Sequence, residues 1–200
     1  MKNKNKLLLI GLAYKTTVYF ILFISRVLPD FDQSSSHVYS HWDTIHYESL
    51  AQSGYKFEHQ WAFFPGIPFI TSLIPSQLAS GILIGLISIP TIPTLFDLSL
   101  AVLKLPNLAY LTTLLSIFTS SPAIIHIAGY AEPLFTFCSY RGMLECTRAH
   151  WYSAALYFMI ASALRSNGIL LAGFHIWHLI AYPLLFNGRV CASCPIQTSQ

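Results

Sequence analysis

The chain has 200 residues, of which 54% are hydrophobic and only 10% charged, and its mean hydropathy is +0.54. Soluble domains carry about 25% charged residues, so this composition excludes a soluble fold that covers its surface with charge. The formal net charge is only +3, and the basic residues are scattered and form no basic stripe. We therefore expect no nucleic acid as a partner.

Long segments without Asp, Glu, Lys or Arg dominate the chain. They are residues 62–96, 105–131, 149–164 and 168–188. A helix that crosses a bilayer requires roughly 20 mostly apolar residues, and helices satisfy their own backbone polar groups in lipid. We therefore predict an all-α, polytopic membrane protein that forms a single membrane domain over residues 1–200. The five or six expected spans cover residues 7–28, 69–89, 95–119, 122–140, 151–166 and 168–186.

The first span is expected to be a retained signal-anchor helix. Its apolar region is longer than a signal-peptide core, and no small-residue cleavage site closes it. Lys2, Lys4 and Lys6 precede it, and basic residues stay on the cytosolic side. This orientation predicts that residues 29–68 form a large first lumenal loop.

The predicted lumenal loop is the most polar part of the chain. It holds five of the eight acidic residues, interleaved with aromatic residues that prefer the membrane–water interface. Residues 42–53 are predicted to form one short interfacial helix, which Gly54 ends. Prolines interrupt the following spans, so we expect some of these spans to be kinked, broken or re-entrant; the prolines are Pro75, Pro90, Pro93, Pro106 and Pro122.

The charged cluster of residues 141–150 indicates a cytosolic loop. It contains Arg141, Glu145, Arg148 and His150 between two apolar segments. With this loop on the cytosolic side, residues 129–132 and residues 165–168 are expected near the lumenal side.

Asp43 is the first candidate for a catalytic residue. A carboxylate at the membrane surface can accept the proton of a sugar hydroxyl. If the donor is a lipid phosphate sugar, the leaving phosphate is already a stable anion and requires no acid, so one carboxylate suffices. The alternative is structural, because Ser40 and Asp43 have the spacing of a helix capping box.

Glu132 and Arg165 are charged residues at the ends of apolar segments. Charges in membranes usually face a cavity or a partner, so these two residues could form an ion pair with each other. Alternatively, the planar fork of Arg165 suits a phosphate group. The histidines of the loop lack metal-ligand spacing, and no metal site is predicted.

Several uncommon strings, in order along the chain, resemble the GPI mannosyltransferase 2 family. These strings are His41-Trp42-Asp43, Gly54-Tyr55-Lys56-Phe57-Glu58-His59, Trp61-Ala62-Phe63-Phe64-Pro65-Gly66, Ser121-Pro122-Ala123, Ala128-Gly129-Tyr130-Ala131-Glu132-Pro133-Leu134-Phe135 and Arg165-Ser166-Asn167-Gly168. The resemblance covers about residues 7–175.

The resemblance implies a multi-pass GT-C-type glycosyltransferase of the endoplasmic reticulum membrane. Such an enzyme transfers the second mannose, in α1,6 linkage, from dolichyl-phosphate mannose to the GPI precursor by inversion. Both lipid-linked substrates are expected partners, a small membrane subunit is a candidate partner, and no cofactor or metal is implied. Asp43 occupies the position of the catalytic acidic residue. The residues expected to bind substrate are Trp42, Glu58, His59, Trp61, Tyr130, Glu132, Arg165 and Asn167.

The resemblance also implies a protein considerably longer than the 200 residues of this chain. We therefore expect the chain to be a truncated form that is inactive alone. The alternative function is that of a non-catalytic truncated membrane subunit or an inactive fragment. A small transporter is a third class, but its helices should carry repeated polar positions, and these helices are mostly apolar.

Overall fold

The computed structural model describes residues 2–25, 43–74, 77–118 and 129–185, in which all regular structure is helical. The elements are α1 (Lys2–Ser25), α2 (Asp43–Ser53), the 3-10 helix η1 (Glu58–Ala62), α3 (Gly66–Ser72), α4 (Gln77–Leu103), α5 (Pro106–Ile117), α7 (Glu132–Thr147), α8 (Trp151–Leu164), the 3-10 helix η2 (Ser166–Leu171), α9 (Ala172–Ile176), the π-helix η3 (Trp177–Ala181) and α10 (Tyr182–Leu185). The predicted all-α class is therefore confirmed for the described residues.

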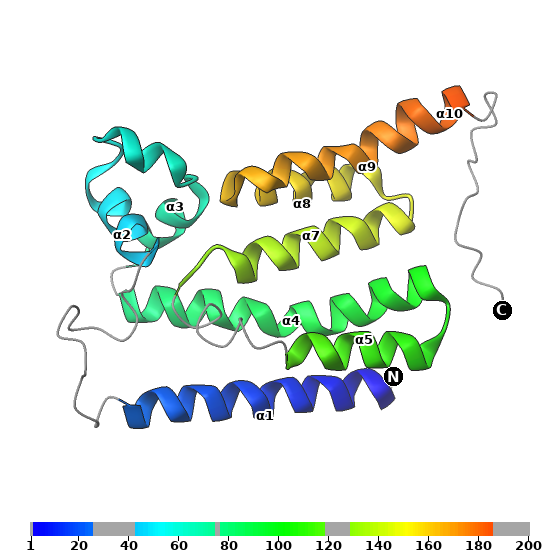
Figure 1. Ribbon diagram of the computed structural model, residues 1–200, viewed down its shortest axis with the longest axis horizontal. Coiled ribbons are helices and arrows are strands. Elements are labelled where there is room, and N and C mark those ends of the chain that lie inside the picture. Colours follow the sequence, from blue (N-terminus) through cyan, green and yellow to red (C-terminus); the bar gives the residue numbers. More distant parts are fainter. Residues whose placement is uncertain (1, 26–42, 75–76, 119–128, 186–200) are drawn as a thin grey trace.

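The long helices lie side by side, and a small helical unit sits at one end of them (Figure 1). This end unit, residues 43–74, contains α2, η1 and α3. A cluster of buried side chains joins it to the bundle. Tyr47 of α2 and Ile67 of α3 pack in this cluster with Ile84 of α4, with Ala131, which precedes α7, and with Leu164 of α8. The end unit is thus fixed against the ends of three bundle helices.

The helix predicted at residues 42–53 is present as α2, and it ends where expected. The backbone N–H of Gly54 donates to the carbonyl of Leu50 at 2.9 Å. Gly54 has a φ of +68°, in the left-handed region that glycine adopts without the steric cost of a Cβ. Ser40 and Trp42, and with them the proposed capping box, lie outside the described residues.

The spans predicted at residues 69–89 and 95–119 are wrong. Residues 66–72 form the separate short helix α3, and one continuous helix, α4, covers Gln77–Leu103 with Pro90 and Pro93 inside it. Prolines are tolerated in membrane helices where hydroxyl groups and neighbouring helices satisfy the backbone around them. The Thr94 hydroxyl donates to the carbonyl of Pro90 at 2.8 Å, whereas the carbonyls that lose an N–H donor to the two prolines are those of Leu86 and Ile89.

The predicted cytosolic loop at residues 141–150 is also corrected. Arg141 and Glu145 belong to α7, which continues to Thr147 instead of ending at residue 140. The Glu145 carboxylate is almost completely buried, and it pairs with Arg141 at 2.8 Å, with Arg148 at 3.3 Å and with His150 at 2.8 Å. The charged cluster is thus paired within itself at the end of α7 and does not interrupt the helix.

The last two predicted spans differ in regularity. Helix α8 covers Trp151–Leu164, close to the predicted 151–166. Residues 166–185 are helical, but 3-10, α and π turns follow one another instead of forming one regular helix. Of the span predicted at residues 122–140, the structure describes only residues 129–140.

Within the described residues, one helical segment has the length and apolar composition needed to cross a bilayer, namely Gly81–Leu103. Its 23 residues correspond to roughly 34 Å of helix, more than the hydrocarbon thickness of about 30 Å. Trp151–Leu164 is apolar but shorter. The helix lengths alone support one span, and the predicted five or six spans stay a prediction.

The segments expected on the cytosolic side and those expected on the lumenal side lie at opposite ends of the bundle. The ammonium group of Lys4 pairs with Asp97 of α4 at 2.6 Å, and this pair lies at the opposite end of the bundle from the end unit (Figure 1). The start of α7 and the end of α8 lie beside the end unit. The relative placement therefore agrees with the expected topology, and the compartment that each end faces stays a prediction.

Candidate active site

A polar cluster forms where the end unit meets the bundle. Asp43 is the first residue of α2, Tyr130 lies two residues before α7, Glu132 begins α7, and Arg165 follows α8. The backbone of Asp43 donates a hydrogen bond to the phenol oxygen of Tyr130. The Arg165 guanidinium forms an ion pair with the Glu132 carboxylate. Three segments far apart in the sequence thus bring four predicted site residues together.

The side chain of Tyr47 lies close enough to Asp43, Glu132 and Arg165 for all three charges to shift its pKa. Tyr47 lies one helical turn after Asp43 on α2, and its side chain is buried. Burial, the carboxylate of Asp43 and the carboxylate of Glu132 raise the pKa of Tyr47 to about 12, and Arg165 opposes this shift. Glu58 and His59 are not among the groups that shift this pKa.

Tyr130 is held protonated by similar causes. Burial, then the carboxylates of Asp43 and Glu132, raise the pKa of Tyr130, while the hydrogen bond from the Asp43 backbone lowers it. At neutral pH both Tyr47 and Tyr130 are therefore neutral phenols. A neutral phenol can donate its O–H to the hydroxyl or phosphate oxygens of a substrate.

The ion pair leaves hydrogen-bonding capacity on both partners. Oε1 of Glu132 contacts Arg165, whereas Oε2 is buried and has no hydrogen-bond partner among the described residues. The Arg165 side chain is 38% exposed, and its guanidinium carries five N–H donors. The pairing that the sequence suggested is present, and an additional phosphate contact by Arg165 is compatible with it.

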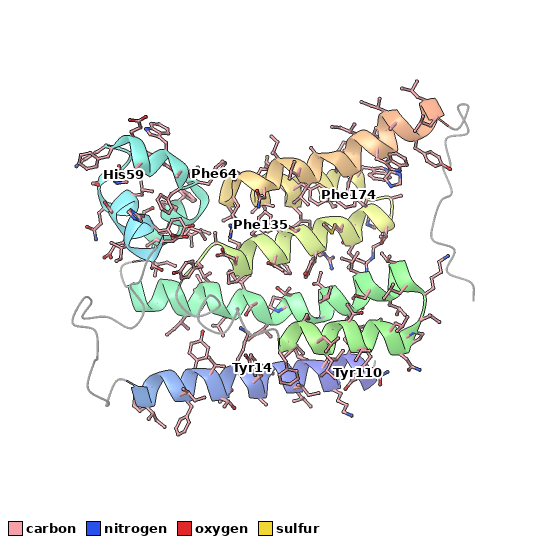
Figure 2. All side chains as sticks on the ribbon, viewed as in Figure 1. Tyr14, His59, Phe64, Tyr110, Phe135 and Phe174 are labelled. Atoms are coloured by element: carbon pink, nitrogen blue, oxygen red, sulfur yellow. The ribbon has the colours of Figure 1, made fainter. Side chains whose placement is uncertain are left out.

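The other predicted substrate-binding residues do not join this cluster. Glu58, His59 and Trp61 lie on the exposed side of η1, and Asn167 is exposed in η2. Trp61 is 69% exposed and stacks on Tyr55 with ring centroids 4.6 Å apart. Figure 2 shows His59 on the part of the end unit that faces away from the bundle. Trp42 lies outside the described residues.

The aromatic end unit is held together by stacking and by three hydrogen bonds that the sequence did not predict. The Tyr55 hydroxyl donates to the carbonyl of Phe63 at 2.6 Å, and burial raises the pKa of Tyr55. The buried Gln60 accepts from the backbone N–H groups of Lys56 and Phe57. His46 stacks on Phe63 at 4.6 Å, and among the described residues no three His, Cys, Asp or Glu side chains are grouped to hold a metal.

Sequence reasoning missed Tyr47. Its position four residues after Asp43 was an available signal, because residues i and i+4 of a helix lie on one face. The burial of this phenol between Asp43, Glu132 and Arg165 could not be read from that spacing, since it depends on contacts with α7 and α8.

The fold and the cluster together define a helical bundle with a polar site at one end. The chain belongs to the family described as Mannosyltransferase (PIG-V), whose model matches residues 25–186. The family resemblance inferred from the sequence is therefore confirmed. No solved structure matches the chain.

Three relatives illustrate the similarity. The GPI alpha-1,6-mannosyltransferase 2 of Rattus norvegicus is 35% identical over 151 residues, which are 68% of this chain and 30% of that protein. The protein of the same name from Homo sapiens is 35% identical over 152 residues, with the same coverage. The GPI mannosyltransferase 2 of Aspergillus fumigatus is 30% identical over 182 residues, or 80% of this chain and 38% of that protein. The chain thus spans about a third of the length of these relatives.

Proposed function

We propose that this chain is part of a mannosyltransferase of GPI-anchor biosynthesis, which transfers the second mannose in α1,6 linkage from dolichyl-phosphate mannose to the GPI precursor. The family and the names of the relatives support the reaction class. The observation that carries the proposal is the convergence of Asp43, Tyr130, Glu132 and Arg165 at one end of the bundle.

In the proposed reaction, Asp43 accepts the proton of the acceptor hydroxyl. The hydroxyl oxygen forms a bond to the anomeric carbon of the donor, and the bond from that carbon to the phosphate oxygen breaks. The electron pair leaves with dolichyl phosphate, a stable anion that needs no proton from an acid. Because the leaving group needs no acid, a single carboxylate is sufficient. Attack from the face opposite the phosphate converts a β-linked donor into an α-linked product.

The ion pair and the phenols have separate proposed roles. Arg165 binds phosphate oxygens with its remaining N–H groups, and Glu132 fixes the guanidinium through their ion pair. Tyr47 and Tyr130 are neutral donors beside Asp43 and can hydrogen-bond to sugar or phosphate oxygens. Glu58, His59, Trp61 and Asn167 are exposed, and any contact they make with substrate occurs on the outer surface of the end unit or of η2.

Replacement of Arg165 by Lys is expected to lower mannose transfer by about tenfold or more, because lysine keeps the charge but loses the planar fork. The assay is transfer from radiolabelled dolichyl-phosphate mannose in microsomes, with this segment carried in a full-length family member. Arg148→Lys is the matched control, since Arg148 also pairs with a glutamate, at 3.3 Å from Glu145. If the double variant Glu132→Gln/Arg165→Gln regains parental activity, Arg165 serves only the ion pair.

The proposed location is the endoplasmic reticulum membrane, in a multi-pass topology with the end unit in the lumen. Cysteines introduced at Ser53 and at Ala149 test it, because both residues are exposed and lie at opposite ends of the bundle. In sealed microsomes of a variant without other cysteines, an impermeant maleimide should label Ala149→Cys directly and Ser53→Cys only after permeabilisation. The reverse pattern would disprove the topology.

A non-catalytic membrane subunit is the second candidate function. Such a subunit would contact a partner protein through exposed aromatic side chains of η1, including Trp61. In a subunit of this kind Asp43 would act only at the start of α2, so loss of its charge would leave mannose transfer unchanged.

A further inference from the structure

A cavity of about 250 Å³ lies inside the bundle, among α1, α4, α5 and α7. Polar side chains from all four helices line it, namely Tyr14, Lys15, Ser88, Thr91, Ser116, Thr136 and Tyr140. Figure 2 shows Tyr14 on the side of α1 that faces α4. The four residues of the Asp43 cluster do not line this cavity, so it is a separate site.

Lys15 is the only charged residue among those that line the cavity. The described carboxylates nearest to the bundle interior are already paired, Asp97 with Lys4, Glu132 with Arg165 and Glu145 with its own neighbours. No carboxylate of the described residues lies within ion-pair distance of Lys15. A cation among membrane helices is costly and normally faces a partner or a substrate path.

The cavity also contains hydroxyl groups that can donate hydrogen bonds beside the ammonium group of Lys15. The hydroxyls of Ser88 and Thr91 donate to carbonyls of their own helix. The hydroxyls of Tyr14, Thr136 and Tyr140 donate to no acceptor within the part of the chain that the structure describes. One ammonium group and three hydroxyl donors from two helices suit an anion with several acceptor oxygens, such as a phosphate.

The cavity and the Asp43 cluster lie along the same side of α7, with the cavity farther from the end unit. Glu132, Thr136 and Tyr140 follow one another at intervals of four residues, which places them on one side of the helix. Thr136 is therefore about 6 Å, and Tyr140 about 12 Å, deeper in the bundle than Glu132. The cavity volume of about 250 Å³ equals that of about eight water molecules, enough for a phosphate and the first atoms of an attached chain.

We propose that this cavity, with Lys15 as its cation, binds the phosphate group of a membrane lipid. A free phosphate ion would have to give up its hydration and pass between apolar helices before it reached the donors of the cavity. A lipid phosphate carries hydrophobic chains that favour the same depth, so the lipid is the favoured source. The proposal does not depend on mannose transfer, because it concerns binding alone.

The test measures lipid binding to the full 200-residue chain in detergent by native mass spectrometry. Phosphatidic acid should bind, and Lys15→Gln should lower its affinity at least tenfold. Tyr140→Phe removes one donor and keeps the ring, and it should lower the affinity by a smaller factor without a change in thermal stability. Lys6→Gln is the matched control, since Lys6 lies exposed on the same helix, and it should bind as the parent does.

Two comparisons identify the source of the phosphate. Diacylglycerol with the same acyl chains tests the chains alone, and inorganic phosphate tests the anion alone; both should bind much more weakly than phosphatidic acid. Equal binding of diacylglycerol would overturn the phosphate site, and equal binding of inorganic phosphate would overturn the lipid assignment. Affinities of Lys15→Gln and Tyr140→Phe within twofold of the parent would overturn the role of this cavity.

Discussion

Replacement of Asp43 by Asn should lower mannose transfer by about 100-fold or more, the usual contribution of a general base. Asparagine has the size of aspartate and is as good a residue at a helix start, so α2 should form unchanged. Tyr130 accepts its hydrogen bond from the backbone of residue 43, and this contact also survives the substitution. The loss is therefore expected to come from the missing proton acceptor.

The measurement is mannose transfer in microsomes, and surface GPI-anchored protein in cells that lack the second GPI mannosyltransferase. A full-length family member carries this segment, and the parent must restore activity first. Glu48→Gln is the matched control, because Glu48 is an acidic residue of the same helix and, among the described residues, accepts a side-chain hydrogen bond only from Gln52, at 3.2 Å. Asp43→Asn with parental activity would show that Asp43 is structural.

Gly168→Ala should destabilise the protein by about 2–3 kcal/mol, at the upper end of the cost of overpacking. A Cβ on Gly168 would overlap the backbone of Ser162 and lie 2.6 Å from the carbonyl carbon of Ala161. These are backbone atoms of α8, so no change of rotamer can relieve the contact. The expected fall in melting temperature in detergent is roughly 5–10 °C.

The substitution should also reduce activity, because the N–H of Gly168 donates to the carbonyl of Arg165 at 2.9 Å. Displacement of η2 therefore moves Arg165. Gly173→Ala is the matched control: a Cβ there would meet no described heavy atom within 4 Å. Similar melting temperatures for the two variants would contradict the close packing of η2 on α8.

The sequence by itself determined the class of the protein. Long apolar segments require helices, because lipid leaves backbone groups no other partner. The strings around Asp43, Glu132 and Arg165 identified the family that the family model confirms. Gly54 ended α2 as predicted, since positive φ is a local property of one residue.

Only the tertiary structure decided which of the predicted site residues meet. Spacing could not show that Tyr130 contacts the start of α2, or that Tyr47 is buried among the charges of Asp43, Glu132 and Arg165, because these contacts join α2, α7 and α8. It also misplaced helix ends at Pro90 and Pro93 and at the cluster around Glu145. Helix α4 packs against α1, α5 and α7, and Glu145 pairs with Arg141 and Arg148. Neither the packing nor the pairing is visible in a linear sequence, so a proline or a charged cluster alone does not fix where a helix ends.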